Sequence, residues 1–209
     1  MTAMPTAQRF DAQPSDAKRK VTRDDIIPNA EFAPQRKARR AALLPLKRLR
    51  RVDLGPYCTF YFESFETLLF QIQEMLLVEK GGEEQLADEL AAYNPLVPQG
   101  SELVATVMFE IDDERRRAEV LGRLGGVEDR FFIQIGDTRA AGVPEGDIER
   151  TREDGKTSSV HFLHFSLTPA QAAQFRDPAV TAMIGCDHPL YAHLSVLQPE
   201  TRAELAKDL

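Results

Sequence analysis

Residues 55–82, GPYCTFYFESFETLLFQIQEMLLVEKGG, constrain the fold more than any other part of the chain. The aromatic-rich residues 57–62 alternate as a β-strand does. Ser64 can cap a following helix, because its hydroxyl can accept a hydrogen bond from a first-turn N–H. Apolar residues then recur at three- and four-residue spacing until Gly81-Gly82, which predicts a left-handed helix end.

The predicted helix near 65–80 is apolar on two sides, since Phe70 and Leu77 stand about two turns apart opposite the main apolar stripe. A helix of this kind is usually buried between layers. Its polar positions Gln71, Gln73 and Glu74 must then find hydrogen-bond partners. They predict either the polar lining of a ligand pocket or an ordinary network between elements. The second interpretation is favoured, because buried polar groups are paired more often than they are catalytic.

The remaining patterns predict one α+β domain over residues 21–209, behind a disordered tail over residues 1–20. Further helices are predicted over 83–93, 113–124, 168–175 and 199–209. Further strands are predicted over 103–111, 131–135, 138–143, 147–153, 157–167 and 180–185. We therefore expect a mainly antiparallel sheet of about five or six strands packed with helices, around a buried central helix near 65–80.

The net charge of −7 is distributed unevenly along the chain. Residues 17–51 carry twelve Lys/Arg and three Asp/Glu, whereas residues 52–209 carry thirteen and twenty-eight. A basic arm on an acidic body can fold back onto it, dock an acidic partner or bind a polyanion. The candidate cations for contact with an anion or a partner are Arg39, Arg40, Lys47, Arg48, Arg50 and Arg51.

Residues 31–51 of this arm are helix-prone, and we expect breaks at Pro34 and Pro45. Nucleic-acid binding is disfavoured, because only Phe32 and Gln35 could stack on or read bases and the acidic body would repel a polyanion. A solvated or internally paired basic helix is the favoured interpretation.

The histidines and Cys186 raise the question of a metal site. Cys186, His188 and His193 could supply three ligands, because imidazole and thiolate bind transition metals. The set lacks a CxxC or HxxxH pair, so a buried cysteine at a strand end with His188 in a turn is favoured. His161 and His164 differ by an odd number and would lie on opposite faces of a strand.

Signatures of common enzyme classes are missing from the sequence. It contains no GxxxxGK[ST] loop, GxGxxG or GxSxG, and no Glu-x-x-His for a di-iron centre. Two cysteines, Cys58 and Cys186, cannot supply the four thiolates of a typical iron–sulfur cluster, so no cofactor is predicted. The absence of a membrane-length apolar run and of a signal peptide favours the cytoplasm.

Several segments resemble an uncharacterised bacterial family, domain of unknown function thirty-five oh one. The resemblance rests on RRVDLGP (50–56), QIQEMLLVE (71–79), ELAAYN (89–94), VATVMFEI (104–111), SSVHFLHF (158–165) and the Asp187-His188-Pro189-x-Tyr191 turn. It extends from about residue 21 to the C-terminus. It implies no activity, but it does imply a setting among rubrerythrin-like proteins and iron–sulfur oxidoreductases.

Two functional hypotheses follow from these observations. The first is a non-enzymatic cytosolic accessory protein whose basic arm docks a protein partner; the resemblance implies an iron–sulfur oxidoreductase or a rubrerythrin-like protein. The alternative is a metal- or small-molecule-binding enzyme with a site between Gln71/Glu74 and Cys186/His188. The sequence does not decide whether the protein is an enzyme, nor its oligomeric state.

Overall fold

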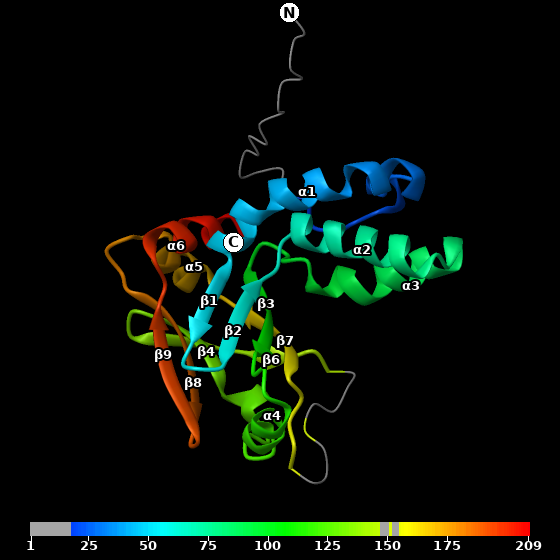
Figure 1. Ribbon diagram of the computed structural model, residues 1–209. Coiled ribbons are helices and arrows are strands. Elements are labelled where there is room, and N and C mark those ends of the chain that lie inside the picture. The colour runs from blue at the N-terminus through cyan, green and yellow to red at the C-terminus, as the bar shows by residue number, and fades with distance from the viewer. Residues whose placement is uncertain (1–17, 147–150, 152–154) are drawn as a thin grey trace, which may run out of the picture.

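Two antiparallel sheets packed face to face form the body of the protein, and a layer of helices lies on one of them (Figure 1). The structure is a computed structural model that describes residues 18–146, 151 and 155–209. Sheet A has the strand order β1-β2-β3-β7-β6 and sheet B the order β5-β4-β8-β9. The α+β class predicted from the sequence is confirmed.

The strands of sheet A are β1 (Arg51–Leu54), β2 (Cys58–Phe62), β3 (Glu102–Phe109), β7 (Val160–Ser166) and β6 (Val143–Pro144). Those of sheet B are β5 (Thr138–Ala141), β4 (Phe131–Ile135), β8 (Ala182–His188) and β9 (Tyr191–Val196). Their inner faces make the main core, in which the Phe60 ring meets Phe131 edge to face at 5.5 Å. This pair joins sheet A to sheet B, and such burial is the main stabilising term.

The α-helices are α1 (Asn29–Leu49), α2 (Phe65–Glu79), α3 (Gly82–Tyr93), α4 (Glu114–Leu121), α5 (Pro169–Arg176) and α6 (Pro199–Leu205). Short 3-10 turns are η1 (Arg23–Asp25), η2 (Asn94–Leu96), η3 (Val127–Arg130) and η4 (Ala206–Asp208). Phe175 of α5 and Leu205 of α6 enter the main core and close one end of it. None of the helices in the described part of the chain is long and apolar enough to cross a membrane.

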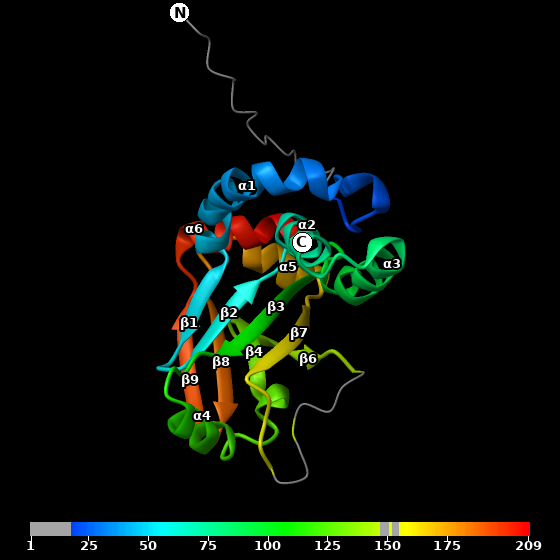
Figure 2. The same ribbon diagram turned by 45° about the vertical axis from the view of Figure 1, so that its right-hand side comes forward.

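Helix α2 occupies the central position that its two apolar sides predict. Leu68, Ile72 and Leu76 form a second core with Val104 on the outer face of sheet A. On its other side Phe70 packs edge to face against Phe32 of α1, with ring centroids 5.9 Å apart. Figure 2 shows α1 lying above α2, with α2 and α3 side by side. The helix is thus buried between α1 and the sheet.

The two ends of α2 compare differently with the sequence prediction. Ser64 caps it as expected, its hydroxyl accepting from the Thr67 amide at 3.3 Å. At the other end a left-handed φ occurs at Lys80, with 58°, and again at Gly82, with 75°, whereas Gly81 between them is not left-handed. Gly81 instead donates its amide to the Gln85 side chain at 2.6 Å, because α3 starts at the next residue. The predicted left-handed conformation is thus found at Gly82, but α2 already ends at a left-handed Lys80, one residue before the glycine pair.

The arm is one continuous helix, so the predicted breaks at Pro34 and Pro45 are wrong. Each proline removes only one backbone hydrogen bond. Packing supplies the compensation, because Phe32 is buried against Phe70 of α2, and Arg50 is anchored just past the end of α1. Tertiary contacts here override local propensity.

The strand count also differs from the expected five or six, because the described residues form nine strands in two sheets. The sequence pattern does not predict β9 (Tyr191–Val196), and it places Tyr191 in a turn. The exposed face of β9 carries Ala192, Leu194 and Val196, whereas the less exposed face carries Tyr191, His193 and Ser195, so the usual pattern of apolar residues inside and polar residues outside is reversed. The strand predicted over 147–153 and the Asp154-Gly155 turn lie largely outside the described residues; Thr151 bridges to Thr157.

Near its described start, the chain is already fixed to the body. The Arg19 guanidinium donates to the carbonyls of Pro98 at 3.1 Å and Asp208 at 2.9 Å. Thr22 and Asp25 form the capping box that their spacing predicts. The tail predicted over residues 1–20 lies outside the described residues up to residue 17.

Candidate functional site: a cationic ridge beside a cleft

Five exposed cations of α1 have no ion pair in the described structure. We call this set, Lys37, Arg39, Arg40, Lys47 and Arg48, the cationic ridge. Lys37, Arg40 and Arg48 recur at the spacing of one helical face, on which Leu44 is 45% exposed. Glu31 is the sole acidic residue of α1, so the helix does not neutralise itself.

The opposite side of α1 holds the helix on the body. Phe32 is buried, and the Asn29 amide donates to the Leu76 carbonyl at 2.8 Å. Arg36 makes a two-pronged pair with Glu74 of α2, at 2.8 Å from Nε and 2.6 Å from the terminal nitrogen. The ridge therefore stands on a helix whose position is set by its inner contacts.

Arg50, one of the six candidate cations, is not available to a partner. It is 3% exposed and donates to both Asp208 oxygens at 2.7 and 2.8 Å, and to the Glu63 carbonyl at 2.8 Å. Glu204 completes the cluster at 3.3 Å. Burial lowers the pKa of Arg50, but the Asp208 and Glu204 carboxylates outweigh it and raise the pKa. Burial raises the pKa of Asp208 against the pull of Arg50.

Arg51 lies on β1, away from the ridge. It pairs with Asp53 at 2.9 Å and lies over the Tyr61 ring at 5.8 Å. Hydrogen bonding to Tyr61 raises the pKa of Arg51. Four of the six candidate cations therefore belong to the ridge. Of the other two, Arg50 is a buried anchor and Arg51 lies on the surface of sheet A.

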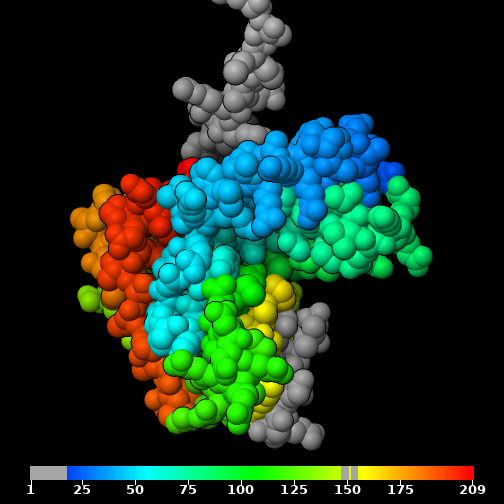
Figure 3. All heavy atoms as spheres, viewed as in Figure 1, coloured from blue at the N-terminus to red at the C-terminus, as the bar shows by residue number. Residues whose placement is uncertain are grey.

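A cleft of about 430 Å³ lies beside the ridge, between the helical layer and the outer face of sheet A. Its floor is made by Tyr61 of β2, Met108 of β3, and Val160 and Phe162 of β7. In Figure 3 the hollow lies below α1 and α2. Lys47 of the ridge is among the residues that line it. The volume suits one bulky side chain or a small molecule.

One carboxylate lines the cleft in a fixed position. Glu63 accepts from the Thr106 hydroxyl at 2.6 Å on one oxygen and from the Thr67 hydroxyl at 2.6 Å on the other. These bonds lock its rotamer, and no described cation forms an ion pair with it. The cleft therefore carries a preorganised negative charge on its wall.

The three polar positions of α2 have separate environments. Gln73 is buried and bonds the Ile27 backbone twice, accepting from its amide at 3.1 Å and donating to its carbonyl at 2.9 Å. Glu74 is held by Arg36. Gln71 is exposed and lines the cleft. Only Gln71 of the predicted set thus borders a cavity.

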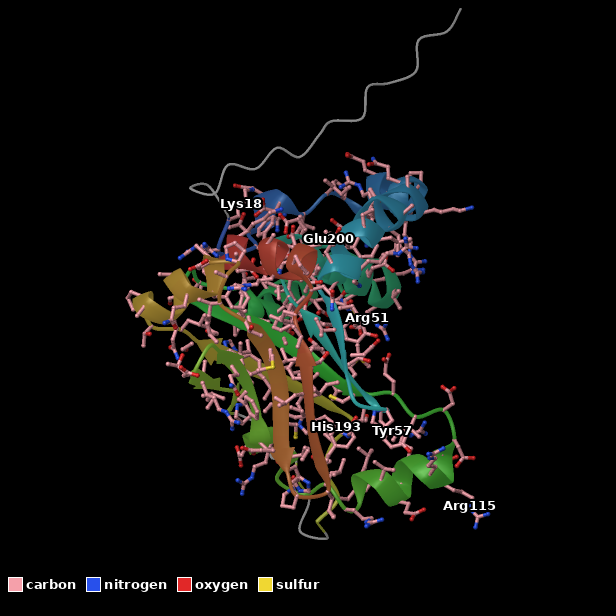
Figure 4. All side chains as sticks on the ribbon, turned by 90° about the vertical axis from the view of Figure 1, so that its left-hand side faces the viewer. Lys18, Arg51, Tyr57, Arg115, His193 and Glu200 are labelled. Atoms are coloured by element: carbon pink, nitrogen blue, oxygen red, sulfur yellow. The ribbon has the colours of Figure 1, made fainter. Side chains whose placement is uncertain are left out.

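Cys186, His188 and His193 face the same side of sheet B, since Cys186 pairs with His193 and His188 with Tyr191. Figure 4 places His193 beside Tyr57, at the turn between β1 and β2. The His188 ring accepts from the Leu190 amide at 3.2 Å. Across the described residues, no group of three or more His, Cys, Asp and Glu side chains is arranged to hold a metal ion.

The two cysteines are poor nucleophiles in this fold. Burial raises the pKa of the Cys186 thiol to about 11, and burial raises that of Cys58 still further. At neutral pH both stay protonated, whereas the thiolate is the reactive form. Cys186 lies inside the main core, whereas Gln71 and Glu74 lie on α2 beyond the outer face of sheet A. The structure does not bring these two sets together.

His161 and His164 point to opposite faces of β7, as their spacing predicts. His161 is buried in the main core, with its ring nitrogen 2.9 Å from the Ser158 carbonyl. His164 lies on the outer face, bridging Glu102 at 3.1 Å and Glu145 at 2.8 Å. Hydrogen bonding to Glu102 raises the pKa of His164, against burial, and Glu145 adds to the effect.

Sequence reasoning missed the floor of the cleft and the Glu63 lock. The alternation of β2 puts Tyr61 on the outer face, and that of β7 puts Val160 and Phe162 there, so the signal was present. It could not show that α2 and α3 would leave part of this face uncovered. That depends on where the helices sit, which no local pattern encodes.

Comparisons with known proteins agree with the family resemblance. A family model described as "Protein of unknown function (DUF3501)" matches residues 20–209. The chain is also similar to the crystal structure of a protein of unknown function from Burkholderia pseudomallei, with 38% identity and a TM-score of 0.84. The match covers 91% of this chain and 99% of that one. No curated protein matched the chain.

Proposed function

The chain belongs to this family of proteins of unknown function, and from its own surface we propose that it is a non-enzymatic binding module whose cationic ridge docks an acidic partner protein. The observation that carries the proposal is the set of five ridge cations without ion pairs to any described residue, on a chain of net charge −7. A charge pattern of this kind steers association and selects partners.

The acidic body does not neutralise the arm. The anchoring contacts use Arg36 and Arg50, whereas the ridge cations are exposed and form no ion pair among the described residues. Unpaired exposed cations contribute little to stability, so their clustering supports a role in recognition. Of the three alternatives open for a basic arm, docking a partner is the one this geometry favours over folding back.

A protein partner fits this surface better than a nucleic acid. The ridge lies on a single helix, and the residues that follow this helix, 52–209, carry twenty-eight acidic and thirteen basic side chains. A long polyanion would meet repulsion beyond the ridge, whereas a local acidic patch would not. Leu44 is exposed among the cations, and its apolar contact suits a protein interface.

The family resemblance supplies a class of partner to test: an iron–sulfur oxidoreductase or a rubrerythrin-like protein, in the cytoplasm. A partner of this class that presents an acidic patch would complement the ridge. Deleting residues 1–51 is a poor test, because it would also remove buried Phe32 and the Arg50 anchor. Reversing surface charges leaves both in place.

The proposal is tested with a triple variant, Lys37→Glu/Arg40→Glu/Arg48→Glu. The control, Arg115→Glu/Arg123→Glu/Arg176→Glu, changes the net charge equally on exposed residues away from α1; Figure 4 shows Arg115 on α4, far from that helix. Binding of a fluorescein-labelled polyglutamate peptide is followed by anisotropy at about 20 mM salt, where screening is weak.

We expect the ridge variant to bind at least about tenfold more weakly than wild type and the control variant to bind within about twofold of it. Raising the salt to about 300 mM should remove the difference. Equal loss in both variants would contradict a localised docking surface. Tighter binding of a duplex DNA of matched charge would instead favour a polyanion ligand.

A further inference from the structure

The cleft next to the ridge is open, largely apolar and bordered by a ridge cation, Lys47. We propose that it receives one bulky apolar side chain of the partner segment whose acidic residues contact the ridge. This inference rests on the proposed function, since it assigns a second contact to the same docking event.

The floor of the cleft is suited to an apolar group. Tyr61, Met108, Val160 and Phe162 present their side chains on the outer face of sheet A, where α2 and α3 do not fully cover the strands. All four are partly exposed, unlike the inward-facing residues of the same strands. Burying an aromatic or branched side chain against such a floor is favourable in proportion to the apolar area removed from water.

Lys47 joins the cleft to the ridge. It is exposed, it has no ion pair in the described structure, and it lines the cleft while standing one turn from Leu44 on α1. An acidic residue that pairs with Lys47 would place its chain neighbours at the mouth of the cleft, because adjacent side chains are separated by only a few ångströms. Charge and apolar contacts are therefore continuous on this surface.

The Glu63 carboxylate selects which side chain of the partner segment can enter the cleft. Its carboxylate is fixed on the cleft wall by Thr67 and Thr106, so a second carboxylate inside the cleft would be repelled. The acidic groups are thus kept outside on the ridge, and an uncharged side chain enters. The expected motif is one tryptophan, phenylalanine or leucine flanked by Asp or Glu.

Two labelled nonapeptides test the motif: glutamates around a central tryptophan, and the same peptide with alanine in the centre. The variant is Gln71→Trp, which fills the cleft from an exposed position on α2. The control is Val78→Trp, on the same helix, where Val78 is 65% exposed and outside the cleft. Circular dichroism and a melting curve verify that both variants fold.

Wild type and Val78→Trp should bind the tryptophan peptide at least about tenfold more tightly than the alanine peptide. Gln71→Trp should lose that advantage and keep wild-type affinity for the alanine peptide. The charge-reversed ridge variant should bind both peptides more weakly than wild type, by the same factor.

Each contrary result identifies which proposal fails. Equal affinity of wild type for the two peptides overturns the apolar anchor while the ridge proposal stands. If Gln71→Trp loses binding to both peptides, the proposal of an apolar anchor is also overturned, because the substitution would then act on the ridge. If neither peptide binds wild type at low salt, the docking function and the anchor both fail.

Discussion

The residue just past the end of α1 and the exposed face of that helix carry the same kind of side chain in opposite environments. Arg50 is 3% exposed and meets Asp208 and Glu204, whereas Lys37 and Arg48 are exposed and pair with no carboxylate of the described residues. A buried guanidinium must be paired, because desolvation of a lone charge costs several kcal/mol. An exposed cation stays hydrated, so it needs no ion-pair partner within the fold and is available to a partner protein.

The comparison shows that the arm is both a structural element and a surface for recognition. Arg50 ties the end of α1 to the C-terminal η4, so residues far apart in sequence hold the arm in place. The ridge cations, by contrast, are presented by a helix that does not need their charge. Substitutions on the two sides should therefore separate stability from binding.

The largest effect is expected for Arg50→Met, which keeps the length of the side chain and removes its charge. Asp208 and Glu204 would remain buried without their cation, and the Glu63 carbonyl would lose its donor. We expect the free energy of unfolding to fall by about 3–5 kcal/mol at neutral pH, measured by urea denaturation. A loss below about 1 kcal/mol would contradict an anchoring role.

The pH dependence of that loss follows from Asp208. Burial already raises its pKa above 3.8, and removal of Arg50 takes away the lowering influence. A carboxyl whose folded pKa is raised contributes stability below its unfolded pKa and loses it as pH rises through the folded pKa. The deficit of Arg50→Met should therefore shrink as the pH falls from about 7 to about 4, and a constant deficit would exclude this cause.

His164 is intermediate between the buried Arg50 and the exposed ridge cations, because its side chain is half-buried and can lose its charge. Its folded pKa is raised above 6.5, chiefly by Glu102. Its contribution should be complete below pH 6.5 and be lost as the pH rises through the folded pKa. Wild type should lose about 1 kcal/mol more than His164→Gln between about pH 6 and pH 9, measured by urea denaturation. Parallel curves would show that the Glu102–His164–Glu145 bridge contributes no pH dependence.

The parts of the fold that local chemistry determines were predictable. The Ser64 cap, the strand–helix order over 57–80 and the opposite faces of His161 and His164 follow from hydroxyl capping and from side-chain periodicity. The sequence predictions fail where a contact between residues distant in sequence determines the local structure. Helix α1 passes through Pro34 because Phe32 is packed on α2, and α2 ends at a left-handed Lys80, before the glycine pair, because α3 begins so soon.

The candidate site was predictable only in part. The excess of cations before residue 52 was visible, but nothing local distinguished Arg50 from Arg48, because their difference lies in the carboxylates of α6 and η4 more than 150 positions away. The same holds for Gln71 and Gln73, which differ only in whether the Ile27 backbone is within reach. Assigning such residues requires the tertiary structure.

The smallest stability effect is expected for Lys37→Met/Arg40→Met/Arg48→Met on the ridge. Methionine has nearly the helix propensity of Lys and Arg, and these side chains have no ion pair to lose in the described structure. The urea midpoint should stay within experimental error of wild type, while binding of the polyglutamate peptide should fall. A large loss of stability would show that the ridge cations interact with the acidic body. That result would remove the contrast with Arg50 and with it the main support for the docking proposal.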